Sequence, residues 1–578
     1  MISQATIEIR NKKSDPRQII CLAAFGIIAL GFGLRLYHLA SESLWYDELL
    51  QLDIAQGMPP GQGGVATIFP RLRGHAAVPL DYLIVHFWIW LGRGEGWTRL
   101  PAVLVGTLTL PVVYQLGRRL LGRTEGLLLM ALLAVSPFHV RYSQETRPYA
   151  LLVLGVILAG YALWQFRATG RRRYLLLLQV GVLIFALAHL FAVVLFVPFL
   201  LWAAADFILG ASRRQAFRSL VALAGTGFVA LVTLLALGYG SAIYYSTREF
   251  GKAVAEPEKF TVEAEQKPNQ GAGPQVDGLF VQREILTPLG AGVYEPGLWL
   301  FNGLAGLGLL FLLTQKRYSL SLLLVLWLII PPMAIVSFLV YRGTFFSPRY
   351  IISILPAYLA LLTAGLFALP RWLRCAEPGW ISKGALVVLG GLVLLASVTE
   401  LSGLYAEQKN ENWRLVSQFL AQNAQAHDAV MAVNAESTLN WYYPPARAEV
   451  NSFDTLATIQ AKVTQNRRSW VIVSVFSNYL GDEVLKIRAW LGEQGAIRMV
   501  FDPVIDVYYL GPDTNPPQLL QEIQSMALPV DHALYASLAR ENRRNPAVAK
   551  RYYELAIEHV PDEETRAEYQ AALTALGR

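Results

Sequence analysis

The chain has 578 residues, of which 54% are hydrophobic and only 16% are charged. Its mean hydropathy of +0.39 excludes an ordinary soluble protein and predicts a membrane protein. The net charge of +7 does not indicate nucleic acid, because the basic residues form short clusters between apolar runs, as in the cytoplasmic loops of membrane proteins. Two cysteines, Cys21 and Cys375, are too few for a disulfide framework or a cysteine metal site.

Eleven apolar runs are long enough, or nearly so, to cross the hydrocarbon layer of a membrane. They lie at about 18–40, 98–117, 125–139, 147–166, 173–189, 190–209, 219–239, 298–314, 319–340, 350–369 and 383–403. The first run is longer than the core of a signal peptide, so we interpret it as a retained helix. A shorter stretch at 79–91 is typical of a re-entrant or interfacial segment. The sequence therefore predicts a polytopic α-helical membrane protein with about 11–13 transmembrane helices.

The basic clusters predict the orientation of these helices. They lie at 10–17, 118–123, 167–173, 213–218, 316–317 and 371–374. All of them face the cytoplasm only if the stretch at 79–91 does not cross the membrane. Segments 41–97, 140–147, 240–297, 341–349 and everything after residue 404 are then extracytoplasmic. We expect a multi-pass protein of the cell (inner) membrane, with its active site on the extracytoplasmic side.

Four parts of the chain follow from this pattern. We predict a cytoplasmic N-terminus (1–17), a transmembrane domain (18–403), an extracytoplasmic α/β domain (404–512) and a helical tail (513–578). In the α/β domain, helical periodicity at 413–425, 456–465 and 482–493 alternates with strand-like runs at 429–433, 470–475 and 504–510. The tail resembles a single tetratricopeptide unit, which needs a neighbour to stack on. It therefore caps the α/β domain or binds a protein partner.

Charged side chains beside membrane segments are costly and are therefore candidates for function. In the loops predicted to be extracytoplasmic they form an ordered set: Asp47-Glu48, then Arg71, Arg73 and His75, then Glu145 and Arg147, then Arg349-Tyr350. Each of these charged residues can also be explained by a purely structural role. The acidic pair can cap a helix, the arginines can reach lipid headgroups from helix ends, Glu145 can pair with Arg141 or Arg147, and His75 can be an ordinary loop residue.

The ordered set resembles the GT-C superfamily of lipid-phosphate-sugar glycosyltransferases, specifically family 39, which includes protein mannosyltransferases and lipid A aminoarabinose transferases. The resemblance covers roughly residues 18 to 370. Its elements are Asp47-Glu48 in the first external loop (41–78), the block from His75 through 78–82 to 98–101, the stretch from Ser136-Pro137 to 147–149, and Arg349-Tyr350. One departure concerns the donor site: relatives usually have a basic residue followed by two prolines, where this chain has His75-Ala76-Ala77-Val78-Pro79.

The resemblance implies an inverting transfer of a monosaccharide from a polyprenyl-phosphate carrier to an extracytoplasmic lipid, glycan or protein hydroxyl. Asp47 would accept the proton of the acceptor, with Glu48 as its alternate or its orienting neighbour. Arg147 and Arg349 would stabilise the departing phosphate, because arginine suits bidentate phosphate contacts. The remaining candidates for substrate binding are Tyr350, Glu145, His75, Tyr82 and Arg71.

We expect no obligatory cofactor, although a divalent cation could be held by Asp47 and Glu145. The expected partners are the polyprenyl-phosphate monosaccharide, the acceptor and membrane lipids, and not nucleic acid. The loop at 240–297 is either a lid over the active site or an insertion without regular structure. Two other functions stay open: a transporter or flippase of lipid-linked sugars, against which the lack of an internal repeat argues, and a non-catalytic membrane scaffold.

Overall fold

The structure is a computed structural model, and it divides the chain into two compact units. It describes residues 16–57, 64–74, 77–210, 212–241, 244, 276–290, 295–342, 346–373, 379–406, 410–433, 436–443, 455–474, 481–502, 505–511, 532–541, 546–560 and 563–576. Within these ranges the first unit comprises 16–39, 64–244 and 276–406, and the second comprises 40–57 and 410–576. Most of the loop predicted as a lid, 245–275, lies outside the described residues.

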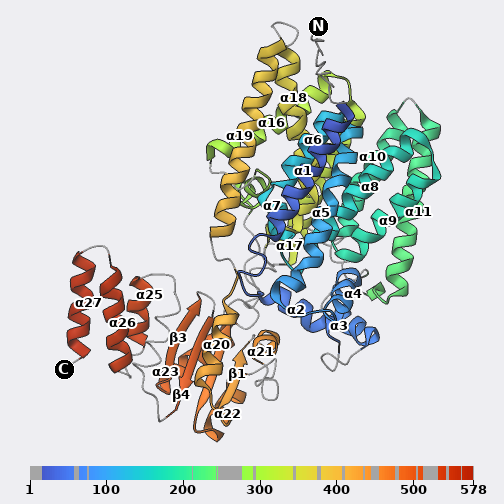
Figure 1. The fold of residues 1–578 in the computed structure, drawn as a ribbon. Helices are drawn as coiled ribbons and strands as arrows, with labels where there is room; N and C mark the ends of the chain where they lie inside the picture. The colour runs from blue at the N-terminus through green and yellow to red at the C-terminus, as the bar shows by residue number, and fades with distance from the viewer. Residues whose placement is uncertain are drawn as a thin grey trace, which may run out of the picture. The chain divides into compact units, whose positions relative to one another are not determined.

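The first unit is a bundle of helices (Figure 1). Its helices are α1 (Pro16–Leu36), α3 (Ile68–Gly74), α4 (Pro79–Trp88), α5 (Glu95–Leu120), α6 (Arg123–Ala134), α7 (Pro137–Tyr142), α8 (Tyr149–Thr169), α9 (Arg172–Ala188), α10 (Ala192–Leu209), α11 (Arg213–Ala236), α14 (Gly278–Phe280), α15 (Thr287–Leu289), α16 (Glu295–Thr314), α17 (Tyr318–Arg342), α18 (Leu355–Leu373) and α19 (Gly379–Ala406). Short 3-10 or π turns add η1 (Val65–Thr67), η2 (Val281–Leu286) and η3 (Pro348–Ile354).

Each of the eleven apolar runs falls on one or two helices of this bundle. Among the described residues, eight helices are long and apolar enough to cross a membrane. The stretch at 79–91 contains the ten-residue helix α4, which is shorter than a spanning helix. The structure therefore confirms the predicted polytopic helical fold.

The apolar run at 125–139 was predicted to be one continuous segment, but in the structure it is divided between two helices. Helix α6 ends at Ala134, and α7 begins at Pro137 with Ser136 as its N-cap. The backbone N–H of His139 donates to Ser136 Oγ at 3.4 Å. Serine at the N-cap and proline at the first helical position together favour a new helix start, because proline cannot continue the hydrogen bonds of the preceding helix.

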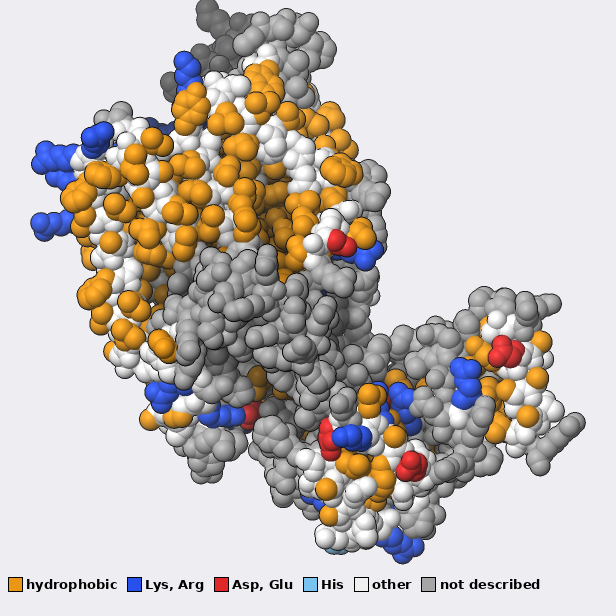
Figure 2. Space-filling view, turned by 180° about the vertical axis from the view of Figure 1, so that it is seen from behind, with side chains coloured by type: hydrophobic (Ala, Val, Ile, Leu, Met, Phe, Trp, Pro, Cys, Tyr) orange, Lys and Arg blue, Asp and Glu red, His pale blue; other side chains and the backbone are white. Residues whose placement is uncertain are grey.

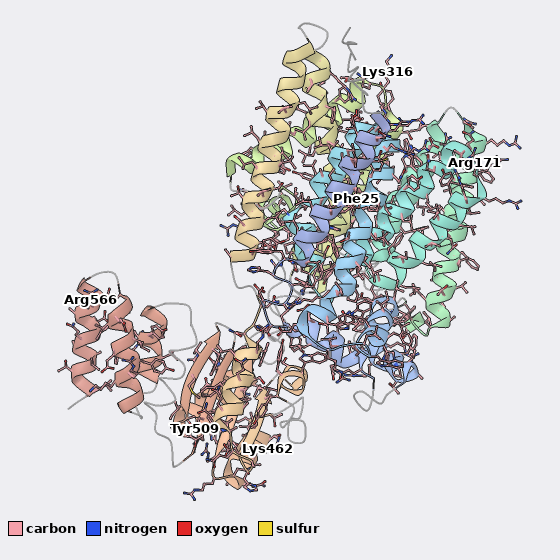
Figure 3. The ribbon with its side chains drawn as sticks, in the orientation of Figure 1. Phe25, Arg171, Lys316, Lys462, Tyr509 and Arg566 are labelled. Atoms are coloured by element: carbon pink, nitrogen blue, oxygen red, sulfur yellow. The ribbon has the colours of Figure 1, made fainter. Side chains whose placement is uncertain are left out.

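The surface of the bundle is apolar. Figure 2 shows hydrophobic side chains over most of its described face, and large apolar residues such as Phe25 (72% exposed) and Leu22 (71%) point outward from α1. In Figure 3, Phe25 lies midway along the bundle, whereas Arg171 and Lys316 project from the end away from α3 and α4. An apolar belt with basic residues beyond it is what a bilayer requires.

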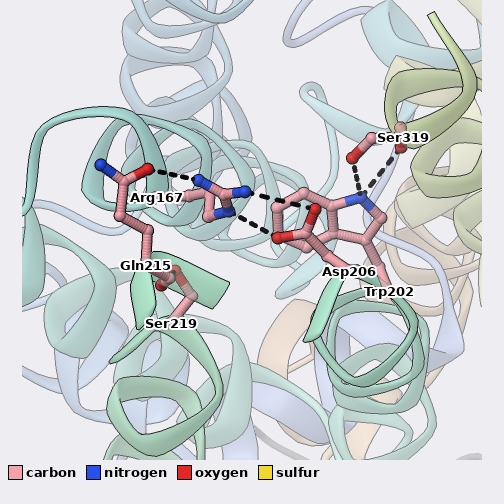
Figure 4. A network of polar contacts seen from close by, with 6 residues as sticks. All are labelled: Arg167, Trp202, Asp206, Gln215, Ser219 and Ser319. Atoms are coloured by element: carbon pink, nitrogen blue, oxygen red, sulfur yellow. Dashed lines mark hydrogen bonds and ion pairs between the residues drawn. The ribbon is translucent and has the colours of Figure 1, made fainter. Parts of the chain in front are cut away.

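Polar groups connect the helices at their basic ends (Figure 4). Arg167, in the last turn of α8, donates to Asp206 of α10 at 2.5 Å and to Gln215 of α11 at 2.8 Å. Trp202 Nε1 of α10 donates to the Ser319 carbonyl at the start of α17 at 2.9 Å. This network fixes the ends of four helices relative to one another.

Inside the bundle, glycines permit close contact between helices. A Cβ at Gly308 of α16 would lie 1.9 Å from the Leu361 carbonyl oxygen of α18, and one at Gly365 of α18 would lie 1.8 Å from the Leu304 carbonyl oxygen. Neither position therefore admits a side chain. Packing of small residues is the usual means of helix association in membranes, and it places α18 inside the bundle.

The second unit contains a four-stranded sheet in the order β1-β2-β4-β3. Its strands are β1 (Ala429–Val433), β2 (Ser469–Ser474), β3 (Ile497–Asp502) and β4 (Ile505–Leu510). Its helices are α2 (Tyr46–Ala55), α20 (Trp413–Asn423), α21 (Glu436–Tyr442), α22 (Leu456–Gln465), α23 (Gly481–Glu493), α25 (His532–Glu541), α26 (Pro546–His559) and α27 (Glu563–Leu576). β1 and β2 are parallel, and the other pairs are antiparallel. The α/β character is thus confirmed, while β3 and α21 were not predicted.

The tail packs on the edge of this sheet. The Tyr552 hydroxyl of α26 donates to the Arg498 carbonyl of β3 at 3.2 Å. Asp506 of β4, which is buried, pairs with Arg498 at 3.1 Å and with Arg488 of α23. The helical tail therefore contacts β3, an edge strand of the sheet.

Candidate functional site

Arg147 and Arg349 come from two segments of the first unit that are distant in the sequence but pack together. Arg147 lies in the connection before α8, and its guanidinium is 5.9 Å from the Tyr149 ring. Arg349 lies in η3, is 9% exposed, and is 5.6 Å from the Tyr350 ring. Because α8 and η3 pack against each other, the two arginines belong to one cluster.

Both arginines act electrostatically on His189, which lies in the turn between α9 and α10. Its ring centroid is 6.0 Å from that of Tyr149 and 6.5 Å from that of Tyr350. Burial lowers the pKa of His189 to about 3, and the positive charges of Arg147 and Arg349 lower it further. We call His189, Arg147, Arg349, Tyr149 and Tyr350 the guanidinium cluster.

His189 is not among the site residues predicted from the sequence. The only local signal is a histidine at the junction of two apolar runs, 173–189 and 190–209, with no turn residue beside it. An imidazole at such a position lies next to membrane segments and is a candidate for function on that ground alone.

Glu145 and Tyr142 border the guanidinium cluster. The Tyr142 ring is 5.2 Å from the Tyr149 ring. Burial raises the pKa of Tyr142, and so does the nearby carboxylate of Glu145. Glu145 is buried and pairs with Arg141 at 3.7 Å, which is one of the two structural pairings considered for it. We therefore place Glu145 at the edge of the cluster.

Buried polar contacts fix the segment that carries Arg147. The Arg35 guanidinium, which is fully buried, donates to the carbonyls of Ala134 (3.1 Å) and Leu133 (3.3 Å) at the end of α6 and lies 2.7 Å from His139 Nδ1. Gln144 Nε2 donates to the Arg35 and Tyr37 carbonyls at 3.1 and 2.7 Å. These bonds hold α7 and the connection after it against α1.

Tyr82 and Arg71 lie on the short helices α4 and α3 and form a second group. Tyr82 is buried, and both Tyr82 and Arg73 lie near Tyr239, just after α11. Burial raises the pKa of the Tyr239 phenol to about 12. Arg71, on α3, is half-buried. His75, also proposed to bind the donor, lies outside the described residues.

The acidic pair lies in the second unit, in the first turn of α2. Glu48 is fully buried, and its Oε2 accepts a hydrogen bond from the backbone N–H of Trp45 at 3.3 Å. That contact is one half of a capping box. Asp47 is half-buried. The two carboxylates therefore have different surroundings, and Glu48 serves the helix end.

Residues of the C-terminal part of the chain bind the segment that precedes the acidic pair. Ser43 Oγ donates to the Glu411 carbonyl at 2.7 Å, and the Leu44 N–H donates to the Tyr442 hydroxyl at 2.7 Å. Asn410 Nδ2 donates to the Ser43 carbonyl at 3.0 Å. Residues 40–57 therefore pack with the α/β domain, an arrangement that no pattern in the sequence indicated.

Metal ligands do not gather in the described part of the chain: it contains no group of three or more His, Cys, Asp or Glu side chains that could hold an ion. The two carboxylates named for a cation, Asp47 and Glu145, belong to different units.

Comparison with known proteins identifies relatives of this chain. Residues 77–239 match the family model of dolichyl-phosphate-mannose-protein mannosyltransferases, and this segment includes Tyr82, Glu145, Arg147 and His189. No curated protein sequence matches the chain.

Solved structures share its fold. ArnT from Cupriavidus metallidurans in the apo state is 14% identical, with a TM-score of 0.50, and the match covers 89% of this chain and 100% of that protein. The apo oligosaccharyltransferase of Archaeoglobus fulgidus is 10% identical, with a TM-score of 0.53 over 86% of this chain and 75% of that protein. The family match and the shared fold confirm the predicted resemblance: this multi-span membrane protein is similar to the GT-C glycosyltransferases of family 39.

Proposed function

We propose that the protein transfers a monosaccharide, with inversion at the anomeric carbon, from a polyprenyl-phosphate carrier to an extracytoplasmic lipid, glycan or protein hydroxyl. The observation that supports this most is the guanidinium cluster, in which Arg147 and Arg349 converge on His189. The family model that matches residues 77–239 is named for an enzyme that uses a lipid-phosphate sugar.

The cluster suits the phosphate of such a donor. A polyprenyl-phosphate sugar is a phosphodiester with one negative charge, and a second charge develops as the bond to the sugar breaks. Two guanidinium groups near one imidazole repel one another, so an anion between them is favourable. Arg147 and Arg349 would then stabilise the leaving phosphate more than the intact donor, which is the requirement for catalysis.

Asp47 is our candidate for the general base. Glu48 already accepts a backbone hydrogen bond at the start of α2, whereas Asp47, beside it, is half-buried. In the reaction the acceptor oxygen attacks the anomeric carbon and transfers its proton to the Asp47 carboxylate. The bond from that carbon to the phosphate oxygen breaks, and the phosphate leaves with the electron pair.

The remaining candidates are assigned to substrate binding. Tyr350 lies in the guanidinium cluster and Glu145 borders it, so both would contact the phosphate or the sugar. Tyr82 and Arg71, in the second group on α3 and α4, would contact the donor farther from the phosphate. No metal ion is needed in this scheme, because the two arginines supply the positive charge that a divalent cation supplies elsewhere.

The test is release of polyprenyl phosphate by the purified full-length protein from synthetic polyprenyl-phosphate sugars mixed with membrane glycan extracts. Wild type should turn over, and Asp47→Asn should lose about 100-fold or more of that rate while still binding donor. Added chelator should leave the wild-type rate unchanged. If wild type binds the lipid-linked sugar but never releases polyprenyl phosphate, a transporter or scaffold replaces the transferase.

A further inference from the structure

His189 lies where the proposed phosphate site would be, yet no role has been assigned to it. It follows the last residue of α9 and precedes α10. The rings of Tyr149, Phe191 and Tyr350 surround it, with centroids 6.0, 5.1 and 6.5 Å away. His189 as a whole residue is half-buried, whereas Tyr149 beside it is 1% exposed.

A hydrogen bond within the turn determines where the ring carries its proton. The backbone N–H of Phe191 donates to His189 Nδ1 at 3.2 Å. A nitrogen that accepts this bond carries no proton, so the neutral ring has its proton on Nε2. The turn therefore orients a single N–H donor away from the backbone.

The surroundings keep this donor uncharged. Burial and the two guanidinium groups hold the pKa of His189 far below its usual value, at about 3. The groups that face the ring are Arg147 from the connection before α8, Arg349 and Tyr350 from η3, and Tyr149 from α8. A third positive charge among them would be repelled, whereas a neutral N–H adds a hydrogen bond without that cost.

We propose that His189 is a third ligand of the donor phosphate, whose Nε2–H donates a hydrogen bond to a phosphate oxygen between Arg147 and Arg349. This inference rests on the proposed function, because it concerns the same lipid-linked phosphate. It assigns to the site a neutral donor whose direction is fixed by the turn between α9 and α10.

Two substitutions of His189 separate hydrogen bonding from packing. His189→Phe keeps a ring of similar shape and removes the donor, whereas His189→Gln removes the ring and keeps a neutral N–H at a similar reach. We expect His189→Phe to raise the KM for donor and weaken binding of polyprenyl phosphate alone by about 10-fold. His189→Gln should restore most of both. Thermal unfolding in detergent should show that both variants fold.

A pH series provides a readout that packing would not change. Affinity of the wild type for the intact phosphodiester donor should be constant from pH 5 to 8, because neither the donor nor a His189 held neutral titrates there. If the affinity instead strengthens as the pH falls through the usual pKa of histidine, the neutral-donor assignment is wrong, because such a gain in affinity requires a charged imidazole.

The outcomes distinguish this inference from the proposed function. If wild type transfers sugar and His189→Phe does so equally well, the inference is wrong and the function stands. If His189→Gln is as defective as His189→Phe, the ring acts by packing and the inference is also wrong. If wild type releases no product but binds polyprenyl phosphate through His189 in the expected pattern, the inference stands and the transferase does not. If wild type does neither, both are wrong.

Discussion

The backbone N–H of Leu44 donates a hydrogen bond of 2.7 Å to the phenol oxygen of Tyr442, although the two residues are 398 positions apart. Leu44 lies three residues before Asp47, the candidate base, and Tyr442 is the last residue of α21. The position of the acidic pair therefore depends on a domain that lies near the other end of the chain.

Replacing Tyr442 with phenylalanine removes the acceptor of this bond. The Leu44 N–H then loses its partner, which costs about 1–3 kcal/mol if the group stays buried. We expect segment 40–57 to loosen, so that kcat falls several-fold while the KM for donor is unchanged. Turnover and hydrogen exchange of this segment measure the effect.

Tyr552→Phe is the matched control. It removes a tyrosine hydroxyl that bonds to Arg498 in the same unit, but at the helical tail. Its kcat should equal that of the wild type. A Tyr442→Phe protein with normal kcat and unchanged exchange at 40–57 would show that the bond does not position the acidic pair.

Glu48 and Asp47 should differ sharply when each is made neutral. Glutamine can take the place of glutamate in a capping box, so Glu48→Gln should keep its contact with the Trp45 N–H and lose less than about 10-fold of the rate. Asp47→Asn should lose far more. Rates of polyprenyl phosphate release decide between them. Equal losses would mean that Glu48 takes part in the proton transfer or that both residues only support α2.

Arg147→Lys and Arg349→Lys keep the charge at the guanidinium cluster and remove the planar fork. Because lysine cannot make the bidentate phosphate contact, each variant should weaken donor binding by about 10-fold. The control is Arg141→Lys, which changes an arginine that is 42% exposed and pairs with Glu145 in the same connection. Binding of radiolabelled donor measures all three, and equal effects would argue against a phosphate contact.

Arg35→Met should destabilise the protein. The carbonyls of Leu133 and Ala134 would lose their donor in a buried position, and each unsatisfied group costs about 1–3 kcal/mol. We expect a lower Tm in detergent and a lower yield. Arg17→Met, at the exposed opposite end of α1, should leave the Tm unchanged. An unchanged Tm for Arg35→Met would show that water or lipid headgroups satisfy these carbonyls.

The sequence predicts the elements of this fold much better than their contacts. Apolar runs report the helices because a spanning segment needs length and hydropathy, both of which are local. The Ser136-Pro137 pair is also a local signal for a helix start, although the continuous apolar run around it concealed the break between α6 and α7. Strand β3 was missed because only three residues separate its six residues from the end of α23 and only two separate them from the start of β4.

The candidate site was only partly predictable for the same reason. Arg147 and Arg349 were identified because charge beside a membrane segment is unusual. Their meeting at His189, and the binding of Leu44 by Tyr442, depend on which helices pack together, and no local pattern encodes that. The assignment of Asp47, Arg147 and Arg349 to catalysis stays a prediction.

The glycine contacts of α18 have a consequence for how the protein is made. Membrane helices enter the bilayer one after another as the ribosome delivers them, and α18 comes after α16 and α17. Its window is apolar enough to rest in lipid but is entirely buried in the finished bundle. The earlier helices must therefore leave a lipid-filled groove until α18 arrives and displaces the lipid. A larger residue at Gly308 or Gly365 would leave α18 inserted but undocked, a state that membrane quality-control proteases can recognise.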